Sequence, residues 1–114
     1  GVPYQLTYFI RWRVAVRLTG REVTAIKKAT KDVLGEGAQL RVFGSRTNDL
    51  AKGGDIDLMI TVGEAVSNPA WAIARIEAKI IEQLGDQKID IVLNAPNLEK
   101  SMIHYVAQEQ GIVL

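Results

Sequence analysis

Residues 44–57 of this chain, GSRTNDLAKGGDID, carry the residue types and the spacing that could do chemistry. Asp55 and Asp57 lie two residues apart at the start of an apolar run. Because strand side chains alternate between the two faces of a sheet, both carboxylates should project from one face. Two carboxylates held close together repel unless a proton or a cation neutralises them. The spacing therefore indicates a site for a hard divalent cation such as Mg²⁺, which prefers oxygen ligands.

A Gly-Ser pair precedes these aspartates and follows an apolar run of its own. Gly44 allows a backbone to approach a phosphate closely, and the amide and hydroxyl of Ser45 can donate to phosphate oxygens. Arg46 and Lys52 could add positive charge against a leaving pyrophosphate. The stretch thus predicts a phosphate-binding turn beside a metal site.

A third carboxylate, Asp90, interrupts the apolar segment KIDIVL at residues 88–93. If that segment pairs with a strand over residues 55–62, Asp55, Asp57 and Asp90 could converge on one face. Three acids around one or two metal ions are the usual equipment for phosphoryl or nucleotidyl transfer, where one ion activates the attacking hydroxyl and the other holds the triphosphate. The three aspartates are therefore the candidate catalytic residues and metal ligands.

Each of these features taken alone has a simpler explanation. A Gly-Ser pair is usually only a turn, and an aspartate on a strand usually meets water. Two other phosphate and metal motifs fail on spacing. Gly44 is not followed by the G-K-[ST] of a P-loop, and Leu58 and Met59 stand where an EF-hand loop needs glycine and oxygen ligands. The combination of turn and carboxylates, in this order, is what favours a catalytic site.

The elements that must position these residues follow from periodicity and capping. Thr19 and Glu22 form a T-x-x-E capping box before a helical apolar pattern, and Asn68-Pro69 is typical of another helix start. The expected elements are a helix over 19–34, a strand over 38–43, a loop or a short helical turn over 46–54, a strand over 55–62, a helix over 69–84 and a strand over 88–93. A last helix is expected to be capped by Asn97, to carry Leu98, Met102, Ile103 and Val106, and to be stopped by Gly111. This order predicts an α/β or α+β fold, a small mixed sheet flanked by helices.

Composition limits the class of protein further. The chain has 114 residues, 47% of them hydrophobic, which fits one domain with a real core. Its formal net charge of +1 provides no bulk field toward nucleic acid or membranes, and no apolar run approaches the roughly 20 residues that span a bilayer. Without cysteine it has neither disulfides nor thiolate metal sites, which fits a cytoplasmic protein.

Three other features are open to two interpretations each. Residues 1–17 mix aromatic and arginine side chains, so they are either an extra strand, with Tyr8 to Val16 alternating, or a basic-aromatic surface for nucleic acid, the less favoured alternative. Trp71 could stack a nucleotide base, although packing in its helix is the commoner role. His104, the one histidine, could be a general base, but a helix histidine usually packs or meets solvent.

The segment FGSRTNDLAKGGDIDLMI resembles the signature of the DNA polymerase beta-type nucleotidyltransferase superfamily, and KIDIVL is similar to its third-carboxylate strand. The small size resembles the minimal nucleotidyltransferases of bacteria and archaea. The resemblance implies the nucleotidyltransferase fold over residues 18–114, with 1–17 as an extension. It further implies a triphosphate-binding turn at Gly44 and Ser45, and two Mg²⁺ ions, with Mn²⁺ as an alternative, on Asp55, Asp57 and Asp90.

The same resemblance implies a reaction and a partner. The reaction is transfer of a nucleoside monophosphate, AMP from ATP, to a hydroxyl. The partner is a HEPN-domain protein, beside which such a small protein acts as the antitoxin. Two alternative functions stay open, a non-catalytic module that acts by protein contact and an RNA-contacting accessory protein. A homo-oligomer is a further possible assembly.

Overall fold

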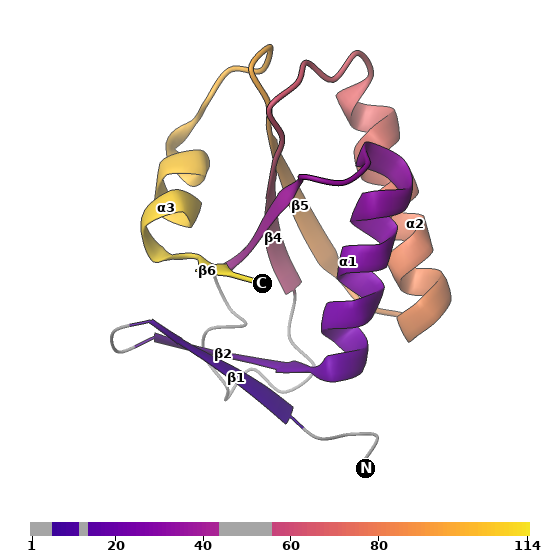
Figure 1. Ribbon diagram of the computed structural model, residues 1–114, viewed down its shortest axis with the longest axis vertical. Coiled ribbons are helices and arrows are strands. Elements are labelled where there is room, and N and C mark those ends of the chain that lie inside the picture. The colour runs from indigo at the N-terminus through magenta and orange to yellow at the C-terminus, as the bar shows by residue number, and fades with distance from the viewer. Residues whose placement is uncertain (1–5, 12–13, 44–55) are drawn as a thin grey trace.

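The computed structural model describes residues 6–11, 14–43 and 56–114, with side chains from residue 18 onward within those ranges (Figure 1). Its elements in chain order are β1 (Leu6–Arg11), β2 (Val14–Thr19), α1 (Gly20–Leu34), β3 (Gln39–Phe43), β4 (Ile56–Thr61), α2 (Pro69–Leu84), β5 (Ile89–Asn94), α3 (Met102–Gln110) and β6 (Ile112–Val113). The helices and strands that the periodicity predicts are present from α1 to α3.

Four strands form the main sheet, in the order β5-β4-β3-β6. β4 and β5 run parallel because α2 carries the chain back between them, whereas β3 is antiparallel to both of its neighbours. The mixed sheet with flanking helices confirms the predicted fold class. β6 was not predicted: its two residues, Ile112 and Val113, follow α3 directly and pair with Val42 and Arg41.

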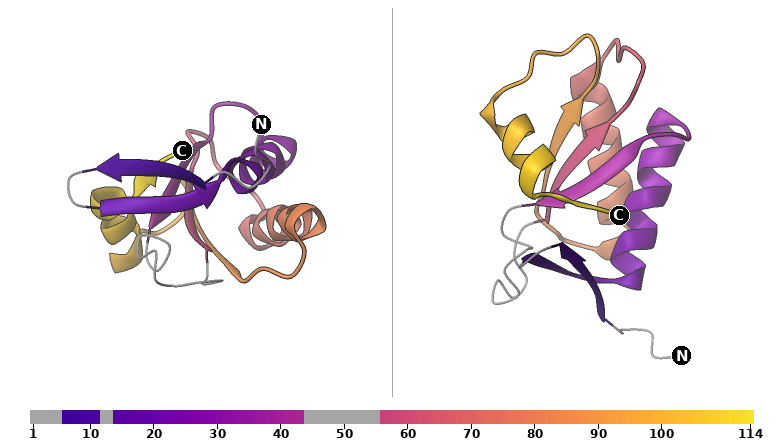
Figure 2. Two further views of the ribbon diagram at one scale, coloured as in Figure 1. Left: turned by 90° about the horizontal axis from the view of Figure 1, so that it is seen from below. Right: turned by 60° about the vertical axis from the view of Figure 1, so that its left-hand side comes forward.

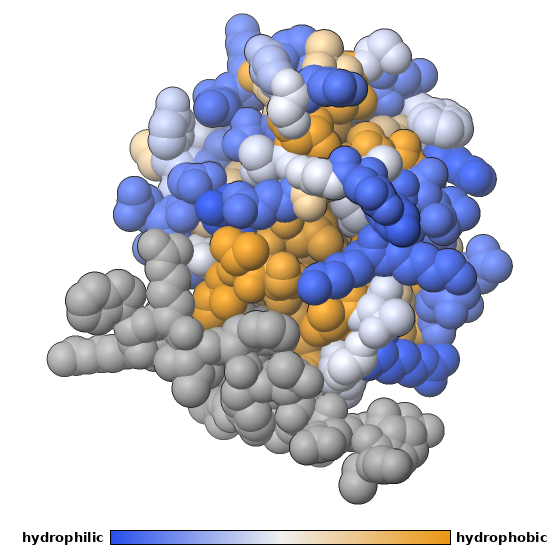
Figure 3. Space-filling model, viewed as in Figure 1, coloured by the Kyte–Doolittle hydropathy of each residue, from blue (hydrophilic) through white to orange (hydrophobic). Residues whose placement is uncertain are grey.

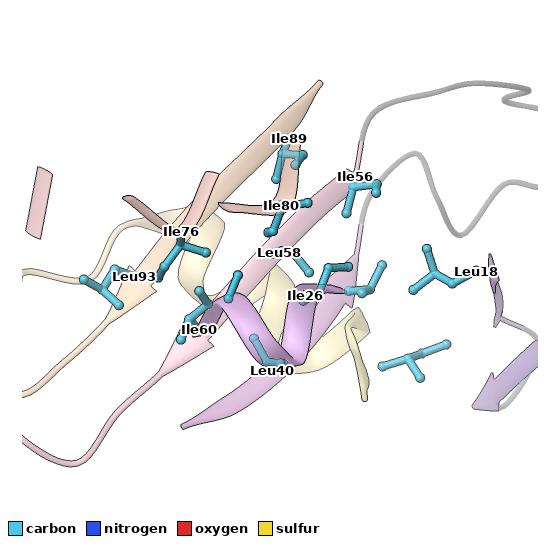
Figure 4. Close-up of a cluster of buried hydrophobic side chains, with 13 residues drawn as sticks. Leu18, Ile26, Leu40, Ile56, Leu58, Ile60, Ile76, Ile80, Ile89 and Leu93 are labelled. Carbon is cyan, nitrogen blue, oxygen red and sulfur yellow. The ribbon is translucent and has the colours of Figure 1, made fainter. Parts of the chain in front are cut away.

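The helices cover the two faces of this sheet unequally. Figures 1 and 2 show α1 and α2 side by side on one face and α3 alone on the other. The main core lies between the sheet and the helix pair, and Figure 4 shows Ile26 of α1, Ile76 and Ile80 of α2, and Leu58 and Ile60 of β4 meeting there, all fully buried. Large aliphatic side chains at helical and strand spacing thus fix the layer order.

The helix ends follow their local sequence. Thr19 caps α1 in the predicted capping box, with Glu22 N–H donating to its hydroxyl at 3.1 Å and its own N–H donating to the Glu22 carboxylate at 3.0 Å. The Asn68 side chain accepts from the Trp71 N–H at 3.1 Å at the start of α2. Gly35 and Gly85 close the two helices at φ values of 81° and 80°, which L side chains rarely adopt. All four boundaries confirm the sequence prediction.

The last helix differs from its prediction. It begins at Met102 after a Ser101 cap, so the predicted Asn97 cap is wrong. Asn97 instead holds another loop, accepting from the Val66 N–H at 2.9 Å and donating to the Val66 carbonyl at 2.8 Å. Because both polar atoms of the Asn97 side chain bond the Val66 backbone, that side chain is not available to cap the helix that follows.

The beginning of the chain forms a separate two-stranded sheet. β1 and β2 pair antiparallel, from Leu6 opposite Thr19 to Arg11 opposite Val14. Residues 1–17 therefore contain one strand and most of a second, where a single extra strand was predicted, and the second leads directly into α1. No helix within the described ranges is long and apolar enough to cross a membrane.

Figure 3 shows the outside of the molecule in the orientation of Figure 1. Hydrophilic side chains cover most of this face, and an apolar area lies in the lower middle of the view, over β6. Val113 is 45% exposed there, while Ile112 beside it is buried.

Candidate functional site

The parallel pairing of β4 and β5 brings two of the predicted catalytic residues together. In this register Asp57 lies directly beside Asp90, each as the second residue of its strand. The pairing that the sequence left conditional is thus confirmed. Directly paired residues on neighbouring strands have Cβ atoms about 5 Å apart, so two carboxylates share one small area.

Strand alternation decides which face of the sheet they share. Ile56, Leu58 and Ile60 of β4 belong to the core under α1 and α2. Asp57 and Met59 therefore point to the opposite face, on which α3 packs, and Met59 contributes to the small cluster there. The same alternation applies along β5, where Ile89 and Leu93 are in the core. Asp90 consequently projects from the α3 side, as the sequence pattern predicts.

The carboxylate pair lies at one end of the sheet. Asp57 and Asp90 are near the amino ends of β4 and β5, and Phe43, the last residue of β3, lies opposite Asp57. Asp57 is half-buried and Asp90 is exposed, so both are placed to meet a ligand from solvent. A buried hydrophobic cluster of Phe43, Met59 and Ala107 lies on the same face. Because this cluster and the sheet hydrogen bonds fix the strands, the two carboxylates have a rigid base.

The remaining predicted site residues, which share the segment between β3 and β4, lie outside the described residues. They are Gly44, Ser45, Arg46, Lys52 and Asp55. Phe43, which precedes Gly44 in the chain, and Ile56, which follows Asp55, both lie at the carboxylate end of the sheet. Within the described ranges no three Asp, Glu, His or Cys residues group to hold a metal. The third ligand thus stays a prediction.

His104 has a structural role in α3. Its Nδ1 accepts the Ser101 N–H at 3.0 Å, and its Nε2 lies 3.0 Å from the Leu93 carbonyl oxygen. The tautomer that fits both contacts carries its proton on Nε2, which donates to that carbonyl. The ring caps the helix and ties it to the carboxyl end of β5, at the opposite end of that strand from Asp90. These contacts favour the packing role over that of a general base.

Trp71 also lies away from the carboxylates. It belongs to the first turn of α2, after the carboxyl end of β4, with 56% of its surface exposed and Arg75 above its ring at 5.7 Å. It lines a cavity of about 260 Å³ together with Val62 and Asn68. Asp57 and Val62 are five residues apart along the chain, a separation of about 16 Å for a strand that rises about 3.3 Å per residue. Stacking on a base held at the carboxylates is thus not favoured.

Arg41 is a charged residue that the sequence pattern did not single out. It lies two residues before Phe43 on β3, and alternation places it on the α3 face with the carboxylates. Its guanidinium donates to the Gln39 side chain, so it turns toward the far end of β3, and its buried Nε has no hydrogen-bond partner. The sequence could have indicated this position, because residues two apart on a strand share a face and Arg41 is two residues before Phe43.

Comparison with protein-family models gives a match to the nucleotidyltransferase domain over residues 23–113. Searches of curated proteins and of solved structures each gave no match. The matched range runs from α1 to β6 and contains the paired aspartates of β4 and β5. Since this range covers most of the 114 residues, the chain belongs to the nucleotidyltransferase domain family.

Proposed function

We propose that this protein transfers a nucleoside monophosphate, AMP from ATP, to a hydroxyl group in a reaction that depends on a divalent metal. The observation that carries the proposal is the Asp57–Asp90 pair on adjacent parallel strands, in a chain of the nucleotidyltransferase domain family. Two carboxylates on one face would supply two of the three acids that metal-dependent nucleotidyl transfer commonly uses.

The donor chemistry of the pair fits Mg²⁺, with Mn²⁺ as an alternative. Carboxylate oxygens of Asp57 and Asp90 are hard ligands, and the family typically uses divalent metals. Asp55 would complete the set, so that two ions could share the three acids. When bound, the ions neutralise the triphosphate and lower the pKa of the attacking hydroxyl. The half-buried position of Asp57 keeps its carboxylate in place for this role.

The proposed step balances as an in-line displacement at the α-phosphorus. The acceptor hydroxyl oxygen forms a bond to that phosphorus, the bond from the phosphorus to the bridging oxygen breaks, and pyrophosphate leaves. Asp90, exposed at its strand, would take the hydroxyl proton. Gly44 and Ser45 would hold the triphosphate, while Arg46 and Lys52 would offset the charge on pyrophosphate.

The acceptor we propose is a hydroxyl on a HEPN-domain protein, for which this chain would be the antitoxin. The support is the resemblance of residues 43–60 and 88–93 to the minimal nucleotidyltransferases. The rival is a module that keeps the fold and acts by contact alone. Binding of ATP with Mg²⁺, measured by calorimetry, separates the two, because a contact module has no need of nucleotide.

Transfer of label from α-labelled ATP tests the proposal directly. The chain is incubated with Mg²⁺, labelled ATP and the product of the neighbouring gene. We expect label on that partner, and a loss of roughly 100-fold or more with Asp57→Asn or Asp90→Asn, comparable to removing a main electrostatic contact to the transition state. Glu64→Gln, an exposed carboxylate beyond the carboxyl end of β4, is the matched control and should leave the rate unchanged.

Two results would count against the proposal. Label transfer that survives Asp57→Asn and Asp90→Asn, with circular dichroism showing both variants folded, would remove the carboxylates from the chemistry. Absence of both ATP binding and label transfer in the wild-type chain would favour the contact module.

A further inference from the structure

The last helix, α3, carries its large apolar side chains on the side that faces solvent. Met102 is 76% exposed, Tyr105 58% and Ile103 41%, whereas Ala107 is the helix residue that is buried. A surface helix of a globular protein normally shows the reverse arrangement. The right-hand view of Figure 2 brings α3, drawn in yellow, toward the viewer on the side of the sheet away from α1 and α2.

Close packing on the inner side explains why large apolar side chains are absent there. Ala107 packs against Phe43 and Met59 of the sheet. At the end of the helix, a Cβ on Gly111 would lie 2.3 Å from the Ala107 carbonyl oxygen and 3.1 Å from the Arg41 Cβ. At Ala107 and Gly111 the space between α3 and the sheet thus admits only small side chains, whereas His104, nearer the start of the helix, reaches the Leu93 carbonyl. The exposed residues contribute little to this packing, so their apolar character needs another explanation.

The three exposed side chains and the half-buried Val106 form a continuous stripe along the helix. At 3.6 residues per turn, Tyr105, Met102, Val106 and Ile103 fall within an arc of about 160°. Glu109 lies in the same arc, one turn beyond Tyr105, and the exposed Lys100 lies just before the helix. We call residues 102, 103, 105 and 106 the outer face of α3. This face is apolar at its centre, with Glu99 and Lys100 just before it and Glu109 and Gln110 at its other end, all four exposed.

We propose that the outer face of α3 binds the same face of a second copy of this chain, as an antiparallel helix pair. A two-fold axis near residues 104 and 105 lays the apolar stretch of each copy on that of the other. Lys100 and Glu109 lie about equally far from this axis in sequence, on opposite sides of it. The axis therefore brings Lys100 of one copy toward Glu109 of the other. A face that complements itself in both apolar character and charge is what a two-fold interface requires.

The size of the face sets the expected strength. Met102, Ile103 and Tyr105 together expose on the order of 350 Å² per copy, less than the ~800 Å² per partner of a standard interface. We therefore expect a reversible dimer with a dissociation constant on the order of micromolar. The proposed pairing uses the outer face of α3 and none of the predicted site residues, so the inference does not depend on the proposed function.

Sedimentation equilibrium of the full chain over a wide concentration range tests this proposal. The mass should rise from 12.5 kDa toward twice that value with increasing concentration. Met102→Lys should weaken the dimer at least tenfold, because it places a charge in the apolar centre. Trp71→Lys, at the similarly exposed aromatic residue on α2, is the matched control and should leave the association unchanged.

A charge exchange tests the antiparallel arrangement itself. Lys100→Glu or Glu109→Lys alone should weaken the dimer about threefold to tenfold, since each end of the helix pair holds one Lys100–Glu109 pair and both pairs are lost together. The double exchange should restore it, because opposite charges then meet again. A wild-type chain that stays at 12.5 kDa throughout, or a Met102→Lys variant that associates like wild type, overturns the proposal. If the wild-type chain stays monomeric, the outer face of α3 would have to be explained by a different protein partner.

Discussion

The two faces of the main sheet are built in different ways. Among the described residues, thirteen buried ones form one cluster centred on the face under α1 and α2, most of them leucine, isoleucine or valine (Figure 4). On the face under α3, the buried cluster formed by the described residues has three members, Phe43, Met59 and Ala107. Asp57 and Asp90 lie on this second face. The difference shows that one face supplies most of the apolar burial and the other is available for charge.

Strand alternation lets the same strand serve both faces. Along β4, Leu58 and Ile60 fill the core while Asp57 between Ile56 and Leu58 faces the other way. A carboxylate can therefore be placed on a central strand without removing an apolar side chain from the core. It follows that substitutions on the two faces should affect different properties, namely stability on one and ligand binding on the other.

The largest loss of stability is expected on the helix-covered face. Ile76 of α2 is fully buried in the main cluster, so Ile76→Ala should lower the free energy of unfolding by about 2–5 kcal/mol. That is a large part of the ~5–15 kcal/mol that stabilises a typical domain. Urea denaturation followed by circular dichroism measures the change. Glu82→Ala, exposed on the same helix, should change it by less than about 0.5 kcal/mol.

If Ile76→Ala and Glu82→Ala cost the same, the helix-covered face would not be the main source of stability, and the comparison between the two faces would fail.

A smaller loss is expected where α3 meets the other face. Gly111→Ala would bring a methyl group within 2.3 Å of the Ala107 carbonyl oxygen, so the chain between α3 and β6 would have to shift. We expect a cost of about 1–3 kcal/mol in the free energy of unfolding, as for other overpacked sites. Gly63→Ala, whose added methyl would meet no atom within 4 Å, is the control and should be nearly neutral.

Thermal unfolding of both glycine variants gives the measurement. Equal midpoints for Gly111→Ala and Gly63→Ala would mean that α3 can move away from the sheet at no cost, and the small cluster beneath it would then contribute little.

Local signals made most of the helix-covered face predictable from sequence. The Thr19 capping box, the Asn68-Pro69 start and the glycine stops each act within a few residues, so they need no knowledge of the tertiary structure. The alternation around Asp57 and Asp90 likewise predicted which residues share a face. That the two aspartates would be direct neighbours required the pairing register of β4 and β5, which no local pattern specifies.

The α3 face was harder to predict because its features depend on distant contacts. Asn97 has the residue type of a helix cap, but its side chain is used by the Val66 backbone thirty-one residues away. β6 has two residues, too few to show a period, and it exists because β3 offers it an edge. The apolar pattern of Met102, Ile103 and Val106 indicated a helix correctly, but the pattern alone does not tell a buried face from one that a partner covers.

The smallest change in stability is expected at the carboxylates themselves. Asp90 is exposed, and Asp90→Asn removes one of two like charges that lie directly beside each other on neighbouring strands. Like charges in that position destabilise a sheet, so without metal the free energy of unfolding should change by less than about 0.5 kcal/mol, or rise slightly. Adding Mg²⁺ should raise the melting temperature of the wild-type chain and of Glu64→Gln, because a ligand that binds the folded state stabilises it, and should have a smaller effect on Asp90→Asn. A metal-free Asp90→Asn chain as unstable as Ile76→Ala would show that the carboxylate face also supports the fold, and the division of roles between the two faces would have to be given up.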